Sequence, residues 1–430
     1  MPSRIRNAQL GLAELIAIGV GGMIGGGIFS VLGLAVDLSG HAAPLAFLLG
    51  SLIAFSVGHC FVRLALTYPG DGSSFTYLRR AFPRRPGLAV LANRAILLGY
   101  VGTLALYAYT FGAYGADLLG AADDARVRMV LSVLVLVFFL IINLKGVRSS
   151  GLAEDLVVYS KIAILAAFAG IGLASVEPAR MRPVFDHGIA AVFLAGALIF
   201  VAYEGFQLIT NAVDESRDPR RDLPRGIYGS IAITSAIYVT LAVVAVGVLS
   251  PDQIRGAEEY ALAAVAQPVL GKAGVVLVDL AALLATSSAI NSTQFGAARM
   301  MADMAGAGAM PRPLARRAHN GVPWAATLAM TAGGVAFTLL GGLATIAAFA
   351  SMTFLWVFLG VAVAALRLRR ETGSHAGIVW AGIALMLATV GLLAAYLWRH
   401  QPDTLLAIGI LYAGLALLGL RRPRASTKYY

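Results

Sequence analysis

The sequence predicts an all-α membrane protein with about twelve transmembrane helices. The composition, the spacing of apolar stretches and the placement of basic residues all indicate this class. Hydrophobic residues make up 59% of the 430 residues, charged residues make up 13%, and the mean hydropathy is +0.80. A soluble domain is typically about half apolar and about a quarter charged. The chain is therefore expected to fold within a lipid bilayer.

Apolar stretches long enough to cross a membrane recur along the whole chain. A helix needs about 20 mostly apolar residues for this. The stretches that meet the requirement are 12–35, 44–66, 88 or 95–119, 127–144, 152–174, 189–213, 227–249, 274–297, 322–340, 343–366, 377–397 and 404–420.

Lysine and arginine concentrate at both termini and in alternate connections between these stretches. The basic connections lie at 79–85, 145–148, 217–225, 312–317 and 367–370, whereas the others hold only scattered basic residues. Short positive loops face the cytoplasm. The chain is therefore predicted to be a multi-pass protein of the inner (plasma) membrane, with both termini cytoplasmic and an even number of spans. The same topology explains the net charge of +11 without a nucleic-acid partner.

The first apolar stretch contains a cluster of glycines. Six of them fall within the nine residues from Gly19 to Gly27. Glycine is a poor helix former, so the helix can break there and leave amides that favour an anion and carbonyls that favour a cation. Pairs such as Gly21 and Gly25 can instead allow close helix packing. The glycine spacing does not fit a dinucleotide site, and neither a cofactor nor a metal is predicted.

The sixth apolar stretch carries Glu204 followed by Gly205 near its middle. A carboxylate at that depth is costly in lipid, so it should face a cavity or a partner, unless it is a protonated or paired structural residue. The interrupted stretches are the first and the sixth, five apart. This arrangement is expected of an inverted repeat of five helices with the binding site between its halves.

Lys161 is the second charged residue placed deep in an apolar stretch. It lies about ten residues into the fifth stretch, too deep for its ammonium to reach either surface easily. It is expected to carry a proton, to replace a bound sodium ion, or to donate structural hydrogen bonds to backbone carbonyls.

The connection 250–273 is the longest on the side opposite to the termini. Its middle, 257–269, forms either a short helix that acts as a lid or a solvated loop. Asp279 follows within two turns of the outer end of the eighth stretch, where water is expected to reach it.

Several motifs in the chain resemble those of the amino acid–polyamine–organocation transporters, the amino acid permease superfamily with the LeuT-type fold. Residues 22–29 are similar to the glycine-rich motif of the family's first helix, which ends in Gly-Ile-Phe. Residues 68–77 look like the loop after the second helix, and residues 203–224 resemble the sixth helix and its exit. Residues 299–311 are similar to the loop after the eighth helix, so the resemblance covers nearly the whole chain.

The resemblance implies one transporter domain over 1–430. It implies a first repeat at about 12–174, a second at about 189–366, and two accessory helices within about 377–420. The substrate site that it implies consists of Met23, Ile24, Gly25, Gly26, Gly27, Val201, Ala202, Tyr203, Glu204 and Gly205. The amides of the three glycines at 25–27 would hold a carboxylate, and carbonyls at 23, 24, 201, 202 and 204 would hold an amino group.

Lys161 falls where sodium-independent members of the family place a lysine. Its implied neighbours are first-helix carbonyls near Gly22 and hydroxyls near Ser287. The resemblance therefore implies proton coupling or exchange rather than sodium symport.

The predicted function is secondary active transport of amino acids by alternating access, in the lipid bilayer and with protons as a possible partner. The alternative is exchange of a polyamine or another organic cation that uses Glu204, because the family usually has a neutral residue there. Several antiporters of the family have an acidic residue where this chain has Gln207, which disfavours exchange of the arginine–agmatine type. The chain lacks His-Glu-x-x-His and Gly-x-Ser-x-Gly motifs, so an enzyme is not expected.

Overall fold

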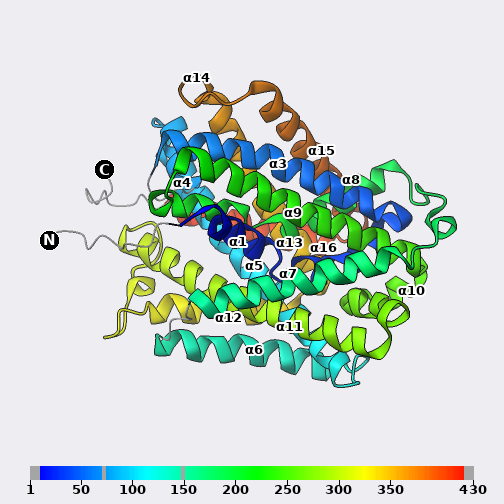
Figure 1. Ribbon diagram of the computed structural model, residues 1–430. Helices are drawn as coiled ribbons and strands as arrows, with labels where there is room; N and C mark the ends of the chain where they lie inside the picture. Colours follow the sequence, from blue (N-terminus) through cyan, green and yellow to red (C-terminus); the bar gives the residue numbers. More distant parts are fainter. Residues whose placement is uncertain (1–9, 70–73, 147–150, 421–430) are drawn as a thin grey trace.

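The computed structural model describes residues 10–69, 74–146 and 151–420 and is built almost entirely of helices (Figure 1). Within these ranges, β-structure is limited to one isolated bridge between Leu10 and Ser216. The predicted all-α class is therefore confirmed.

The helices follow one another with short connections. The first group is α1 (Leu12–Met23), α2 (Gly27–Ser39), α3 (Ala43–Thr67), α4 (Ser74–Ala81), α5 (Pro86–Leu118), α6 (Ala125–Lys145) and α7 (Gly151–Leu173). The second group is α8 (Ile189–Leu198), the 3-10 helices η3 (Ile199–Tyr203) and η4 (Phe206–Glu215), α9 (Pro219–Val248), α10 (Pro251–Gly256), η5 (Glu258–Tyr260), α11 (Ala261–Gly306), α12 (Trp324–Leu340) and α13 (Leu343–Arg367). The last group is α14 (Arg369–Thr372), α15 (Ala376–His400) and α16 (Pro402–Leu420).

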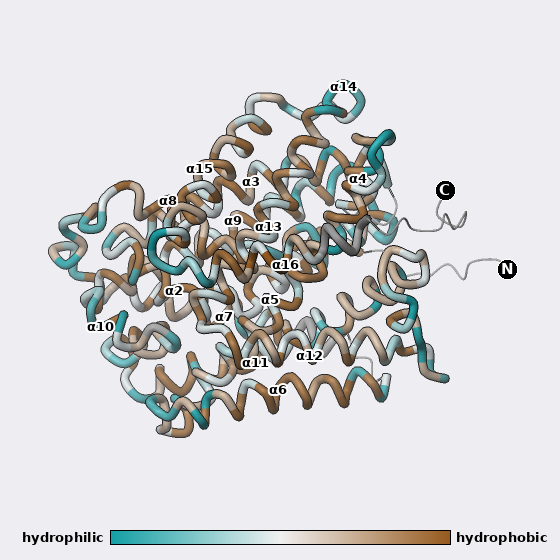
Figure 2. The backbone as a smooth tube through the Cα atoms, turned by 180° about the vertical axis from the view of Figure 1, so that it is seen from behind, coloured by the Kyte–Doolittle hydropathy of each residue, from teal (hydrophilic) through white to brown (hydrophobic). Residues whose placement is uncertain are grey.

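The long helices run along a common direction, and α4 and α10 lie at opposite ends of the bundle (Figure 1). Hydrophobic residues follow the lengths of the helices, whereas hydrophilic residues gather around α4 and α14 at one end and around α10 at the other (Figure 2). We call these the α4 end and the α10 end. This distribution matches an apolar slab between two aqueous faces.

Nine helical stretches in the described residues are long and apolar enough to cross a membrane. Three shorter apolar helices, Leu12–Met23, Trp324–Leu340 and Pro402–Gly414, accompany them. One of the nine stretches, Gly27–Thr67, joins α2 to α3. The membrane character is thus established, while the count of about twelve spans stays a prediction.

The connection 250–273 is helical rather than a solvated loop. It contains α10, η5 and the first part of α11, which ends at a non-helical Gly271 with φ 66° and ψ −163°. Leu262, Val265 and Ala266 are 0% exposed. We call residues 251–270 the cap segment, because it covers the α10 end of the neighbouring helices.

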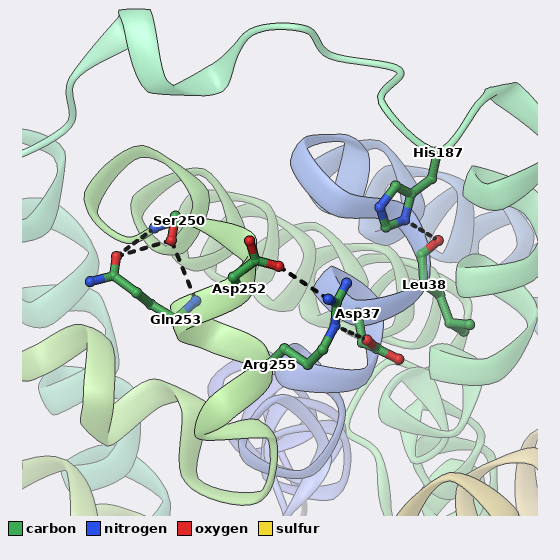
Figure 3. A network of polar contacts seen from close by, with 7 residues as sticks. All are labelled: Asp37, Leu38, His187, Ser250, Asp252, Gln253 and Arg255. Carbon is green, nitrogen blue, oxygen red and sulfur yellow. Dashed lines mark hydrogen bonds and ion pairs between the residues drawn. The ribbon is translucent and has the colours of Figure 1, made fainter.

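Polar contacts attach the cap segment to α2 (Figure 3). The Arg255 guanidinium donates to the Asp37 carboxylate at 2.5 Å and to that of Asp252 at 3.1 Å. A further contact in the same network joins His187 Nδ1 to the Leu38 carbonyl oxygen at 3.0 Å. The cap segment is therefore held against the last turn of α2.

On its other side, the cap segment is held by α5 and α6. The Tyr109 hydroxyl donates to the Glu259 carboxylate at 2.5 Å, and Arg128 forms an ion pair with the same carboxylate. The cap segment thus bridges α2 to the α5–α6 pair.

Candidate functional site

The first helical element is interrupted at the glycine cluster. The last regular bond of α1 runs from the Ile24 amide to the Val20 carbonyl at 2.7 Å, and α2 begins at Gly27. Ile24 has φ −82° and ψ 46°, outside the helical region. The first amides of α2 have no acceptor within their own helix, which is general for helix N-termini. The predicted break is confirmed. The alternative role in close packing holds beside it, because a Cβ atom on Gly22 would lie 3.1 Å from the Gly205 Cα atom and one on Gly25 would lie 2.9 Å from the Ala289 Cβ atom.

A second interruption lies at Glu204 and Gly205. The 3-10 helix η3 ends at Tyr203, Glu204 is extended with ψ 134°, and Gly205 has φ 134° before η4 begins at Phe206. A residue with a side chain rarely adopts that φ, so glycine is required here. Ser351 on α13 supports the segment, because its hydroxyl donates to the Leu198 carbonyl at 2.6 Å and accepts from the Val201 amide at 2.9 Å.

The two interruptions touch each other through their backbones. A Cβ atom on Gly205 would lie 2.5 Å from the Gly22 carbonyl carbon and 2.6 Å from the Met23 amide nitrogen. The Tyr238 hydroxyl bridges the two breaks, since it lies 2.7 Å from the Met23 carbonyl oxygen and 3.2 Å from that of Ala202. Both breaks thus form one structural unit.

A cavity of about 300 Å³ adjoins this unit. Its walls come from α1, α5, α7, the region of η4 and α11, and consist of Ala17, Ile18, Gly21, Gly22, Tyr100, Tyr107, Val158, Glu204, Leu208, Ser288, Ala289, Ser292, Thr293, Gly296 and Ala297. Because α11 starts in the cap segment and runs away from it, the cavity extends from the breaks toward the α4 end.

The predicted site residues fall into two groups. Glu204 and Gly22 line the cavity, and Ser287 is the neighbour of the lining residue Ser288. The remaining substrate-site residues are buried within the two breaks: Met23, Ile24, Gly25, Gly26, Gly27, Val201, Ala202, Tyr203 and Gly205. Tyr107 separates the glycines from the cavity, because a Cβ atom on Gly25 would lie 3.1 Å from its hydroxyl oxygen.

The Glu204 carboxyl group is 5% exposed and faces the cavity. Its position is set by Gln207, whose amide nitrogen donates to the carboxylate while its amide oxygen accepts from the Gly205 amide at 3.0 Å. Tyr100 and Tyr107, seven residues apart on α5, line the same cavity. Aromatic faces next to a carboxylate suit a cationic group.

Lys161 on α7 is 2% exposed and contacts α1 at Gly21, one of the residues that line the cavity. Its ammonium donates to the Gly21 carbonyl oxygen at 3.0 Å. The prediction of a first-helix carbonyl near Gly22 as a neighbour is confirmed by this contact. A hydrogen bond from a charged donor to a helix carbonyl at a break stabilises that break by about 1.5–3 kcal/mol.

Sequence reasoning missed several cavity residues. The tyrosines at 100 and 107 were not singled out, although their spacing of two turns places them on one face of a helix. The eighth stretch, where hydroxyls near Ser287 were expected, contributes Ser288, Ser292 and Thr293 to the wall.

A bundle of apolar helices, with two broken helices meeting beside a partly polar cavity, is the architecture of an integral membrane transporter. Sequence comparison identifies which kind. The chain belongs to the amino acid permease family, whose profile matches residues 10–416. It is a transport protein rather than an enzyme.

Three relatives cover most of the chain, and two of them are named as transport proteins. The chain is 30% identical to the inner membrane transport protein YbaT of Escherichia coli over 94% of this chain and 93% of that protein. It is 30% identical to an uncharacterised protein of Methanocaldococcus jannaschii over 92% of this chain and 90% of that protein. It is 25% identical to the branched-chain amino acid permease BcaP of Bacillus subtilis over 84% of this chain and 81% of that protein.

Proposed function

We propose that the protein carries an α-amino acid across the cytoplasmic membrane by alternating access, with the substrate held between the two broken helices. The observation that carries the proposal is that both breaks meet through their backbones beside a cavity of about 300 Å³. A carboxylate and an ammonium on one small molecule match the free amides and free carbonyls that such breaks provide.

The substrate carboxylate would bind the amides of Gly25, Gly26 and Gly27 once the Tyr107 ring moves aside. The ammonium would bind carbonyls of the same breaks. Two of these, at Met23 and Ala202, already accept from Tyr238. A carbonyl oxygen has two lone pairs, so each can accept a second bond from a substrate ammonium.

The proposed architecture is twelve spans arranged as two inverted five-helix repeats and two accessory helices. Within it, α1 with α2 is the first span and α8 with η3 and η4 is the sixth. The basic connections support a cytoplasmic location for both termini, and in the proposed topology the α10 end is the outer face. The cavity then extends toward the cytoplasm, and the described conformation is inward-facing with a closed outer side.

Lys161 supports sodium independence. Its ammonium occupies a position beside the Gly21 carbonyl, where a sodium ion would otherwise accept the same oxygen ligand. The proposed cycle therefore uses a proton or a second substrate as the driving partner.

A second candidate substrate is a polyamine or another organic cation taken by exchange. The observation that favours it is the Glu204 carboxyl group on the wall of the cavity that Tyr100, Tyr107 and hydroxyl groups of α11 also line. The named relatives include a methylthioribose transporter of Bacillus subtilis as well as an amino acid permease, so membership of the family leaves both candidates open.

A thermal-shift screen of the purified protein in detergent decides between them. A ligand at 100 times its dissociation constant stabilises the folded state by about 2.7 kcal/mol. We expect α-amino acids to raise the melting temperature and the matching amines without a carboxylate to fail. Stabilisation by diamines that equals that by amino acids would favour the organic cation. No stabilisation by any member of either class would refute the site.

A further inference from the structure

Asp279 on α11 is a buried carboxyl group that the proposed substrate site does not use. Its side chain is 0% exposed, and neither carboxylate oxygen has a hydrogen-bond partner among the described residues. The expectation that water reaches it is thus wrong in this conformation, because the cap segment covers the α10 end of α11. An unpaired buried carboxylate costs several kcal/mol, so this conformation favours the neutral acid.

Among the residues that the structure describes, no positively charged group is paired with Asp279. Asp117 on α5 is partly buried and repels a negative charge at Asp279, and the phenol of Tyr114 on the same helix is near both carboxyl groups. Lys272 is exposed two turns away at the α10 end. Lys161 contacts α1 at Gly21, on the other side of the breaks.

Asp279 stands at the outer end of a polar stripe that leads to the cavity. On α11, Asp279, Thr286 and Thr293 are seven residues apart and share one face. Thr293 lines the cavity, and the Thr286 methyl group would lie 3.1 Å from a Cβ atom on Gly26. The helical rise places Asp279 about 10 Å beyond Thr286 toward the outer face.

The facing side of the stripe comes from α5, which packs against α11. Tyr107, Thr110, Tyr114 and Asp117 are spaced by three, four and three residues, so they also share one face. Thr110 and Ser30 of α2 form a hydroxyl pair at 2.6 Å. The buried polar groups therefore continue from the cavity wall at Tyr107 to the outer end of α5.

The cap segment closes the outer end of this stripe. The Tyr114 hydroxyl donates to the Phe29 carbonyl at 3.1 Å and lies beside the backbone of Leu262 in the cap segment. The contacts of Arg255 with α2 and of Glu259 with α5 and α6 hold the segment in place. Gly271 separates the cap segment from the helix that carries Asp279, and its φ of 66° is a backbone conformation that glycine tolerates.

We propose that Asp279 is a proton-binding site that is loaded from the outer face when the cap segment is lifted and is carried as the neutral acid when the segment closes. A proton from external water adds to the carboxylate, and closure then removes the carboxylic acid from water. Closure with an ionised Asp279 would bury a charge without a partner. External acid therefore favours the closed outer side, and one proton is taken in for each closure. This inference rests on the proposed transport cycle.

The test measures the exposure of the cap segment directly. Cys60 is the single cysteine of the chain, so the Cys60→Ala, Ala266→Cys protein carries one reporter in the buried face of the cap segment. A membrane-impermeant methanethiosulfonate added outside proteoliposomes labels the reporter only when the segment lifts. Rates are normalised to an exposed reporter, Gly256→Cys in the same background, because thiolate reactivity itself rises with pH.

The expected result is slower normalised labelling at acidic external pH. One linked proton permits at most about a tenfold change per pH unit, and we expect a fall approaching that value over part of the range from about pH 8 to about pH 5. In Asp279→Asn, an uncharged isostere, labelling should stay slow at every pH. Asp123→Asn, which removes an exposed carboxylate at the same end of α5, should retain the wild-type response.

A response in Asp279→Asn equal to that of the wild type would overturn the proposal. If the Asn variant fails to assemble, the parent protein still tests the proposal, because a labelling rate that is independent of external pH also overturns the proposal. The reporter needs no substrate. A failed thermal-shift screen would therefore refute an amino acid as the substrate, but the labelling measurement would still test the role of Asp279.

Discussion

Substitution of Gly205 by alanine tests the geometry on which the site depends. Gly205 has φ 134°, and an added Cβ atom would lie 2.5 Å from the Gly22 carbonyl carbon and 2.6 Å from the Met23 amide nitrogen. A residue held in a disfavoured backbone region costs about 1–3 kcal/mol, and an extra carbon forced into packed backbone costs about 1–3 kcal/mol more. The expected loss of stability is therefore about 2–6 kcal/mol.

The loss translates into a measurable change in melting temperature. The entropy of unfolding of about 2.1 cal/mol/K per residue gives about 0.9 kcal/mol/K for this length. Gly205→Ala should thus lower the melting temperature by about 2–7 °C, and uptake in proteoliposomes should be lost because the two breaks separate. The assays are a melting curve in detergent and uptake of the ligand found in the thermal-shift screen.

Gly296→Ala is the matched control. Gly296 lines the cavity and lies in a helix, and an added Cβ atom there would meet nothing within 4 Å. Replacing a helical glycine by alanine stabilises by about 0.5–1 kcal/mol, so this variant should melt no lower than the wild type. Normal melting and normal uptake in Gly205→Ala would refute the reasoning, because the contact between the breaks would then be dispensable.

Three further variants test single contacts. Lys161→Ala removes a charged hydrogen-bond donor to the Gly21 carbonyl, a contact worth about 1.5–3 kcal/mol. Uptake should therefore fall about 10- to 100-fold and lose its pH dependence. Full pH-dependent uptake would exclude the coupling role. Glu204→Gln should weaken binding of cationic ligands in the thermal-shift assay by a similar factor and spare neutral amino acids, and equal losses for both would contradict a selective role. Arg255→Gln breaks a half-exposed ion pair with Asp37 that is worth about 0–1 kcal/mol. The labelling rate of the cap-segment reporter should therefore rise by no more than about fivefold. A far larger rise in that rate would show that this pair alone holds the segment.

The sequence was informative where a residue type is costly in a membrane helix. The glycines at 25–27 and the Glu204–Gly205 pair break local rules of helix formation and lipid solvation, and the structure places both breaks beside one cavity. Lys161 was recognised for the same reason, and its carbonyl partner was anticipated one residue away.

Residues whose role depends on distant packing escaped sequence reasoning. Tyr107 looks like an ordinary aromatic residue of an apolar helix, yet it covers Gly25. Tyr238 is 215 residues from Met23 in the chain, and only the fold brings its hydroxyl to that carbonyl. The burial of Asp279 could not be predicted either, because it depends on whether the cap segment folds over the end of α11 or stays solvated.

The hydroxyl of Tyr238 has one proton to share between two carbonyl oxygens on different broken helices. When a ligand ammonium donates a hydrogen bond to one of these carbonyl oxygens, the hydroxyl proton can be donated fully to the other carbonyl oxygen. The tyrosine therefore couples the two carbonyl groups. A change in hydrogen bonding at Met23 changes the hydrogen bond at Ala202 without any displacement of a helix. Binding of a ligand at the first break would thus strengthen the hydrogen bond at the second break.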